Sequence, residues 1–304
     1  MAVGTRPAVG SGARNRARAY RAPGRQRHAW LLHLILIALS LGFLFPFFWV
    51  LSTSLKPLEE TMRTPPVYVP SEFRWQNYVK AFTYQSDKLG YIPFLAYLRN
   101  TVLVCILTVA GTLASNSLVA YAFARLRWRG RDLLFAVTLA TMMVPFPVLM
   151  VPTFALFHHL EWIGTFRPLW VPAWFGSAFY IFLLRQFFLT IPFELSEAAR
   201  MDGCSEWATF RTVILPLAKP ALTVVALFTF MATWNDFLGP LIYLSDQRLF
   251  TLGLGLQQFQ SQQGGTDWNL LMAAAAMVIA PVLALFLVAQ RQFIEGIALS
   301  GLKG

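Results

Sequence analysis

The chain has 304 residues, of which 57% are apolar and only 13% charged, and its mean hydropathy is +0.54. A water-soluble globule could not bury so much apolar surface in one core, so the composition predicts a membrane protein. The formal net charge of +11 and a pI near 10.1 would suggest nucleic-acid binding in a water-soluble domain, so the placement of the charge along the chain matters.

The first 28 residues are rich in Arg, Gly and Ala and contain no acidic residue. Such a segment has too little apolar surface to order itself, and its cations are attracted to anionic lipid headgroups. We therefore expect residues 1–28 to be a disordered basic cytoplasmic tail. Residues 29–304 are expected to form one membrane domain.

Six later stretches are apolar and reach the length of about 20 residues that a helix needs to cross a bilayer. They cover roughly residues 30–53, 98–122, 133–157, 169–189, 220–243 and 269–290. The first stretch is too long for the core of a cleavable signal peptide and lacks a small-residue cleavage site, so it is predicted to remain as a span. The expected fold is all-α, a polytopic membrane protein with six transmembrane helices.

The orientation of these spans follows from Lys and Arg, because cytoplasmic loops carry an excess of them. With the N-terminus inside, 17 of the 25 basic residues lie in cytosolic segments. Six acidic residues then lie inside and eight outside, so the whole net charge of +11 falls on the cytoplasmic side. This distribution predicts an N-in, C-in topology and accounts for the basic pI without nucleic acid.

The longest outer connection, residues 54–97, carries an apolar stripe at Trp75, Tyr78, Val79 and Phe82. Spacing of i, i+3, i+4, i+7 predicts a short amphipathic helix. Two roles remain open for this helix. It could contact a solute-binding protein, or it could lie at the membrane interface and be anchored by its aromatic residues.

A polar loop, about residues 190–219, separates the fourth and fifth predicted spans. Pro192 suits a helix start, Gly203 suits a helix end that needs a left-handed residue, and Ser205 can cap a second helix. The apolar residues of that second helix fall near one face; they are Trp207, Phe210, Val213 and Ile214. We expect two short helices hinged at Gly203, a shape that fits either a docking element or an ordinary capped connector.

The same loop carries a sequence motif. Glu-Ala-Ala at residues 197–199 is followed by three residues, Gly203, nine residues and Val-Ile-Leu-Pro at 213–216. This pattern resembles the cytoplasmic loop motif of ATP-binding-cassette (ABC) importer permeases, with Val213 where the family favours isoleucine. Residues 120–125, 234–237 and 290–304 extend the resemblance. Together the segments are similar to the carbohydrate-uptake branch, and within it to the second permease of maltose-type importers, over roughly residues 28–304.

The resemblance implies the type I ABC importer permease fold and gives the loop a role. In that family the loop is a coupling helix, which docks in a cleft of the cytosolic ATPase and turns closure of the ATPase dimer into movement of the spans. Small residues permit close approach to the cleft, and charged residues can pair within it. The residues expected to couple are Glu197, Ala198, Ala199, Arg200, Asp202, Gly203 and Pro216.

The resemblance also implies a location and partners. The chain would be a multi-pass protein of the bacterial cytoplasmic (inner) membrane and form half of a translocation pore. Its expected partners are a second permease subunit, an ABC ATPase dimer, an extracytoplasmic solute-binding protein and a sugar, with no nucleic acid. The C-terminal tail, residues 295–304, would reach toward the ATPase.

No Walker phosphate loop and no catalytic motif is visible in the sequence. The chain is therefore not expected to be an enzyme or to bind a cofactor or metal. If ATP drives transport, the ATP and Mg²⁺ would be used by the separate ATPase subunit.

Trp234, Asn235 and Asp236, in the outer part of the fifth span, are candidates for the translocation path. Aromatic faces and paired hydrogen-bonding groups suit sugar rings, and a carboxylate within a span must face protein or water. The alternative is a cap or an inter-helix hydrogen bond near a helix break at Gly239-Pro240. Both interpretations remain open from the sequence.

Other functions stay as alternatives. A permease for glycerol phosphate or another polyol would need extra cationic residues in the cavity, and the sequence identifies none. An ion-coupled secondary carrier would need several ionisable residues within the membrane and internal repeats, whereas Asp236 is the one clear candidate and no repeat is evident. A membrane-embedded enzyme would need paired catalytic groups at membrane depth, and no such pair is found.

Overall fold

A computed structural model describes residues 29–260 and 265–301, with side chains as far as Val288 in the last helix. The predicted basic tail, residues 1–28, and residues 302–304 lie outside the described part. The chain divides into two units between Phe48 and Trp49, and the packing below is that of the second unit. Every element in the described ranges is a helix, as the composition predicted.

Among the residues that the structure describes, three helices are long and apolar enough to cross a bilayer unaided. They are α1 (Ala29–Ser54), α5 (Pro93–Arg125) and α16 (Trp268–Gly301). Three bent pairs of shorter helices meet the same criterion, which gives up to six crossings if each pair counts as one span. The six-span expectation is compatible with this set of helices.

The third predicted span is broken at its prolines. It consists of α6 (Arg131–Ala140), η1 (Thr141–Met143) and α7 (Phe146–His159), with a bend of 98°. Val144 is extended, with ψ of 113°. Its successor Pro145 disfavours the helical conformation at the preceding residue and removes a backbone donor, which explains the break.

The fourth and fifth predicted spans are also composite. The fourth contains α8 (Arg167–Trp170), η2 (Val171–Phe175) and α9 (Ala178–Thr190). The fifth contains α13 (Lys219–Trp234) and α14 (Leu238–Tyr243). Three short helices then lead to α16; they are η4 (Gln247–Leu249), α15 (Leu252–Gly255) and η5 (Leu256–Phe259).

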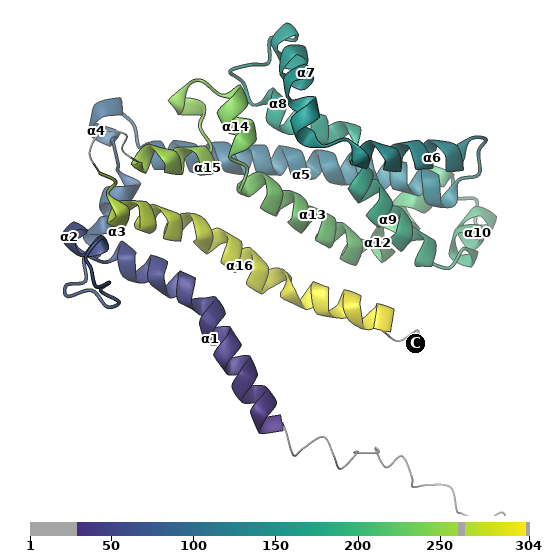
Figure 1. Cartoon of the computed structure of the whole chain (residues 1–304). Coiled ribbons are helices and arrows are strands. Elements are labelled where there is room, and N and C mark those ends of the chain that lie inside the picture. Colours follow the sequence, from purple (N-terminus) through teal and green to yellow (C-terminus); the bar gives the residue numbers. More distant parts are fainter. Residues whose placement is uncertain (1–28, 261–264, 302–304) are drawn as a thin grey trace, which may run out of the picture. The chain divides into compact units, whose positions relative to one another are not determined.

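Helix α5 organises the second unit and contacts α9, α13, η2 and α15 (Figure 1). Its inner half packs with α9 and α13 around Leu184, Phe188 and Val225, each fully buried. Close approach to η2 is possible because Gly111 has no side chain. A Cβ atom there would lie only 2.3 Å from the ring of Trp174.

The outer segment after α1 forms α2 (Leu58–Thr61), α3 (Gln76–Phe82) and α4 (Ser86–Leu89). The predicted helix is confirmed as α3, and which of the two proposed roles its apolar stripe serves remains a prediction. Trp75 and Val79 are 67% and 65% exposed, whereas Asn77 is only 3% exposed. The Asn77 amide faces inward because it donates to the carbonyl oxygens of Ser54 (2.9 Å) and Lys56 (3.0 Å).

Candidate functional site

The polar loop between α9 and α13 begins with helix α10 (Glu194–Met201). Gly203 ends this turn in the left-handed conformation, with φ of 83°. The Cys204 amide donates to the Ala199 carbonyl (2.9 Å), and the Gly203 amide donates to that of Arg200 (3.0 Å). These two bonds form a Schellman motif, the helix ending for which a glycine is favoured. The expected hinge at Gly203 is thus a defined hydrogen-bonded turn.

The second half of the loop starts at α11 (Glu206–Thr209). As predicted, Ser205 caps this helix, its hydroxyl accepting from the Ala208 amide at 3.2 Å. The chain continues through a π-helical turn, η3 (Phe210–Ile214), into α12 (Leu215–Leu217). We name residues 194–217 the coupling elbow.

The elbow presents six of the seven predicted coupling residues at its surface, namely Glu197, Ala198, Arg200, Asp202, Gly203 and Pro216. Ala199 differs, because only 8% of it is exposed. Its small side chain therefore permits close packing within this chain and is not presented to a partner. The coupling role of all seven residues remains a prediction.

The sequence interpretation named Trp207 but missed two other apolar residues that the elbow exposes, Leu195 and Met201. Met201 is 83% exposed, Trp207 is 60% exposed and Leu195 is 42% exposed. Leu195, Ala198 and Met201 recur at intervals of three along α10, and this spacing was the available signal. Exposed apolar side chains on a cytosolic surface are typical of protein-protein contact.

Hydrogen bonds attach the elbow to the inner end of α5. One oxygen of the Glu206 carboxylate is 2.7 Å from the Arg200 guanidinium, and the other accepts from the Tyr121 hydroxyl at 2.7 Å. Arg125, the last residue of α5, donates to the carbonyl oxygens of Phe188 and Ile191 ahead of the elbow. The long span is therefore bonded to Glu206 within the elbow and to the segment just ahead of the elbow.

Trp234, Asn235 and Asp236 lie together at the end of α13. The Trp234 indole is buried and donates to the carbonyl oxygen of Val278 in α16 at 3.2 Å. Asn235 is exposed, and its amide donates to its own helix. The Asp236 carboxylate accepts from the Gly239 amide at 3.1 Å. These are bonds of the capping and inter-helix kind, and contact with a sugar remains a prediction.

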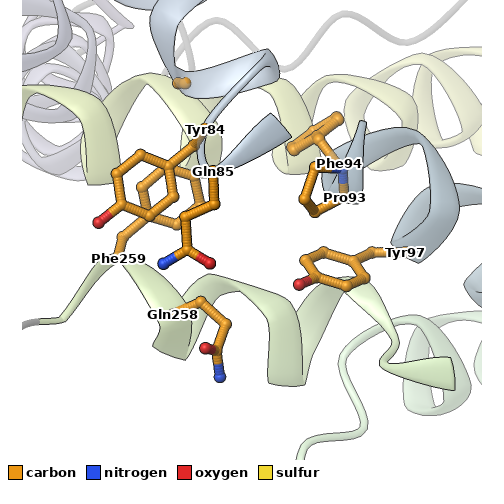
Figure 2. Close-up of a pocket in the computed structure, with 8 residues that line it drawn as sticks. Tyr84, Gln85, Pro93, Phe94, Tyr97, Gln258 and Phe259 are labelled. Carbon is orange, nitrogen blue, oxygen red and sulfur yellow. The ribbon is translucent and has the colours of Figure 1, made fainter. Parts of the chain in front are cut away.

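Two hollows in the second unit differ in size and lining. A groove of about 1060 Å³ runs between α5, α13 and α16, and its lining is almost wholly apolar. A small pocket near the start of α5 has aromatic and amide walls, with Tyr84 stacked on Phe259 at 4.4 Å and Gln85 and Tyr97 alongside (Figure 2). Its volume of about 10 Å³ holds no more than one water molecule. Neither hollow suits a sugar ring.

Comparison with known proteins agrees with this architecture. Residues 116–298 match the family model described as "Binding-protein-dependent transport system inner membrane component". A crystal structure of a bacterial ABC transporter involved in the import of the acidic polysaccharide alginate contains a chain with the same fold. The two chains superpose with a TM-score of 0.76 and 22% identity, over 90% of this chain and 99% of the other.

Curated relatives resemble the chain over nearly its whole length. The arabinooligosaccharides transport system permease protein AraQ of Halalkalibacterium halodurans is 33% identical, over 91% of this chain and 97% of the relative. The trehalose/maltose transport system permease protein MalG of Thermococcus litoralis is 32% identical, over 90% and 96%. The sn-glycerol-3-phosphate transport system permease protein UgpE of Pectobacterium atrosepticum is 32% identical, over 87% and 94%.

The expected ABC importer permease fold is confirmed by these similarities, and so is the multi-pass location in the bacterial inner membrane. The chain belongs to the family of inner-membrane permease components of binding-protein-dependent transport systems.

Proposed function

We propose that this chain is one of two permease subunits of an ATP-driven importer for a sugar or oligosaccharide. Two of the relatives described above are named for the transport of arabinooligosaccharides and of trehalose and maltose, which supports this substrate class. The second permease is a different polypeptide in this proposal. Two ATPase subunits lie on the cytosolic side and use ATP and Mg²⁺, and a solute-binding protein delivers the sugar from outside. This chain itself binds no cofactor.

The observation that carries the proposal is the coupling elbow. Its first helix is short, is closed by a Schellman turn at Gly203 and exposes both charged and apolar side chains. Glu197, Arg200 and Asp202 give it charge, while Leu195 and Met201 give it apolar contact area. A rigid, mixed surface of this kind suits a cleft in a partner protein better than it suits a simple connector.

The proposed mechanism is alternating access. Binding of ATP closes the ATPase dimer, the elbow carries that motion to the spans, and the cavity between the two permeases opens outward to receive the sugar. In this mechanism Trp234, Asn235 and Asp236, at the break after α13, line part of the translocation path for the sugar. Asn235 is the exposed member of this set.

A polyol phosphate is the second candidate substrate, because a third relative is named for sn-glycerol-3-phosphate transport. Uptake of radiolabelled arabinotriose, maltose and sn-glycerol 3-phosphate by cells with and without the gene separates the two classes. Loss of glycerol phosphate uptake alone would replace the sugar assignment.

The test of the whole proposal is affinity purification of the tagged chain in mild detergent, with mass spectrometry of the proteins retained. We expect an ATPase and a second permease. Gly203→Val should reduce recovery of the ATPase, because a β-branched residue at φ of 83° is strained although no atom lies within 4 Å of a Cβ placed there. Gly203→Asn is the matched control, since asparagine tolerates this conformation. A wild-type chain that retains no ATPase would overturn the proposal.

A further inference from the structure

We propose that the carboxylate of Glu206 is the junction through which movement of the coupling elbow reaches α5, with Tyr121 as the positioning residue on the span. This inference rests on the proposed function and specifies how the elbow acts. It concerns transmission within this chain, separate from docking of the ATPase.

The first observation is that the Glu206 carboxylate bonds both α10, the exposed helix of the elbow, and α5, a membrane span. Arg200, at the end of α10, holds Glu206 Oε1 with its Nε at 2.8 Å and its Nη2 at 2.7 Å. Tyr121 donates its hydroxyl to Oε2 of the same carboxylate at 2.7 Å. The two oxygens therefore point in different directions, one toward the exposed helix and one toward the membrane span.

The second observation is that Tyr121 is held in place by more than its hydroxyl. The residue is only 5% exposed, and its ring lies 5.0 Å from that of Phe210, which is 3% exposed. Phe210 begins the π-helical turn that follows α11. A displacement of α11 would therefore act on the Tyr121 ring through packing and on its hydroxyl through Glu206.

The third observation is a second attachment, to the segment that directly precedes the elbow. Arg125 lies one helical turn beyond Tyr121 and bonds the end of α9. The guanidinium carbons of Arg125 and Arg200 each lie 5.7 Å from the ring centroid of Phe193, which leads into α10. Because α5 is bonded both to Glu206 within the elbow and to the segment just ahead of it, a displacement of the elbow would act on that helix at two points.

Helix α5 is suited to carry such motion across the membrane. It contains 33 residues, so at 1.5 Å per residue it is about 50 Å long. Its opposite end bonds the outer connection, where the buried Asn100 amide donates to the carbonyl oxygens of Arg248 (2.8 Å) and Phe250 (3.0 Å). One rigid element therefore extends from the coupling elbow to the outer segments.

The two bonds at Glu206 differ in strength. The side chains of Arg200 and Glu206 are 37% and 44% exposed, so water and salt screen their attraction. The bond from the buried Tyr121 is less screened, and it is charge-assisted. Tyr121→Phe removes this hydrogen bond and keeps the ring, which makes it the decisive variant.

The experiment uses the whole purified complex and needs no identified substrate. The native Cys105 and Cys204 are replaced by Ala and Ser, and spin labels are attached at Leu95→Cys on α5 and Leu241→Cys on α14, both exposed positions. Distances between the labels are recorded without nucleotide and after trapping with ATP and vanadate. Melting temperature and retention of the ATPase are measured on the same samples.

We expect ATP to shift the distance distribution in the complex that carries Tyr121. Tyr121→Phe should reduce the shifted fraction by about half or more while the ATPase stays bound. Tyr180→Phe is the control: it also removes a phenolic hydroxyl, but its ring contacts Phe179 on α9. This control should keep the full shift.

A charge exchange tests the other bond. Arg200→Glu alone should reduce the shift, and Arg200→Glu with Glu206→Arg should restore it, because the exchanged pair can still bond and an arginine can donate to the Tyr121 hydroxyl. A full shift in Tyr121→Phe, with or without a lower melting temperature, would overturn the inference and leave the bond a merely stabilising one. If the parent complex, with Tyr121 unchanged, retained no ATPase or showed no ATP-dependent shift in the distance between the labels, the result would instead contradict the proposed function.

Discussion

Arg125 caps the end of a neighbouring helix by donating from its guanidinium Nη2 to the carbonyl oxygen of Ile191 at 2.6 Å. The same nitrogen donates to the carbonyl oxygen of Phe188 at 2.8 Å. Both carbonyls lie at the C-terminal end of α9, where helical carbonyl groups lack partners and the helix dipole favours a cation. Arg125 is only 3% exposed, so this basic residue is part of the packed interior.

Removal of the Arg125 side chain should therefore destabilise the protein. Arg125→Ala removes both bonds: the Phe188 carbonyl keeps the Ile191 amide as a donor at 3.3 Å, whereas the buried Ile191 carbonyl loses its charged donor, at a cost of about 1–3 kcal/mol in the free energy of unfolding. We expect a clear fall in the melting temperature of the detergent-solubilised protein. Arg129→Ala, an exposed change of equal charge in the following loop, should have little effect. Equal melting temperatures for the two variants would contradict the capping role.

Gly111 should be intolerant of even one added carbon. Gly111→Ala places a Cβ atom 2.3 Å from the Trp174 ring, whose indole nitrogen donates to the carbonyl oxygen of Leu107 at 3.1 Å. The ring cannot remain in that position, and overpacking of this kind costs about 1–3 kcal/mol. Gly42→Ala is the control within a long helix, because no atom lies within 4 Å of its added Cβ. We expect the melting temperature to fall for Gly111→Ala and to stay the same or rise for Gly42→Ala. A larger fall for Gly42→Ala than for Gly111→Ala would show that Gly111 is not needed for packing against Trp174.

The sequence predicted the features that depend on local chemistry. The apolar spans, the Ser205 cap and the left-handed Gly203 each follow from neighbouring residues alone, and the structure confirms the cap and the conformation of the glycine. The directions of side chains were harder to predict. In a membrane protein an apolar residue can face lipid, a partner protein or the interior, so the sequence alone did not show that the polar Asn77 would be the buried residue of α3.

Polar contacts between distant segments were beyond the reach of a sequence pattern. Asn77 is buried because it bonds carbonyl groups more than twenty residues away, and Arg125 bonds carbonyl groups more than sixty residues away. The Tyr121–Glu206 bond joins residues 85 positions apart. Each is a pairing that only the folded chain creates, and each lies at an attachment between the spans and their connecting segments.

The buried Lys56 should make stability depend on pH in the alkaline range. Lys56, just beyond α1, is fully buried, and its ammonium lies 4.1 Å from the centroid of the Trp49 ring. Burial lowers the pKa of Lys56 below its ordinary value of 10.5, although the negative charge of Glu60 partly opposes this shift. Between the folded and unfolded pKa values the unfolded chain binds more protons, so stability should rise as pH increases through that window.

Lys56→Met tests this linkage. The variant should flatten the rise of melting temperature with pH and be more stable than the parent protein at neutral pH, because it avoids burial of a charge. Lys80→Met removes an exposed charge in α3 and should leave the pH dependence intact. An unchanged alkaline slope in Lys56→Met would show that another group causes it.

Asp236 offers a test between capping and contact with the transported sugar. Its carboxylate accepts from the Gly239 amide at 3.1 Å, and a Cβ atom at Gly239 would lie 2.5 Å from the other carboxylate oxygen. This close fit favours a role at the start of α14, so Asp236→Asn, which keeps an acceptor oxygen, should retain most transport. Asp236→Ala should lower stability by about 1 kcal/mol, as loss of a cap does, with a matching loss of folded complex. Transport per folded complex is the quantity to measure in both variants. If Asp236→Asn loses transport while its melting temperature is unchanged, the negative charge acts on the substrate path and the capping interpretation is wrong.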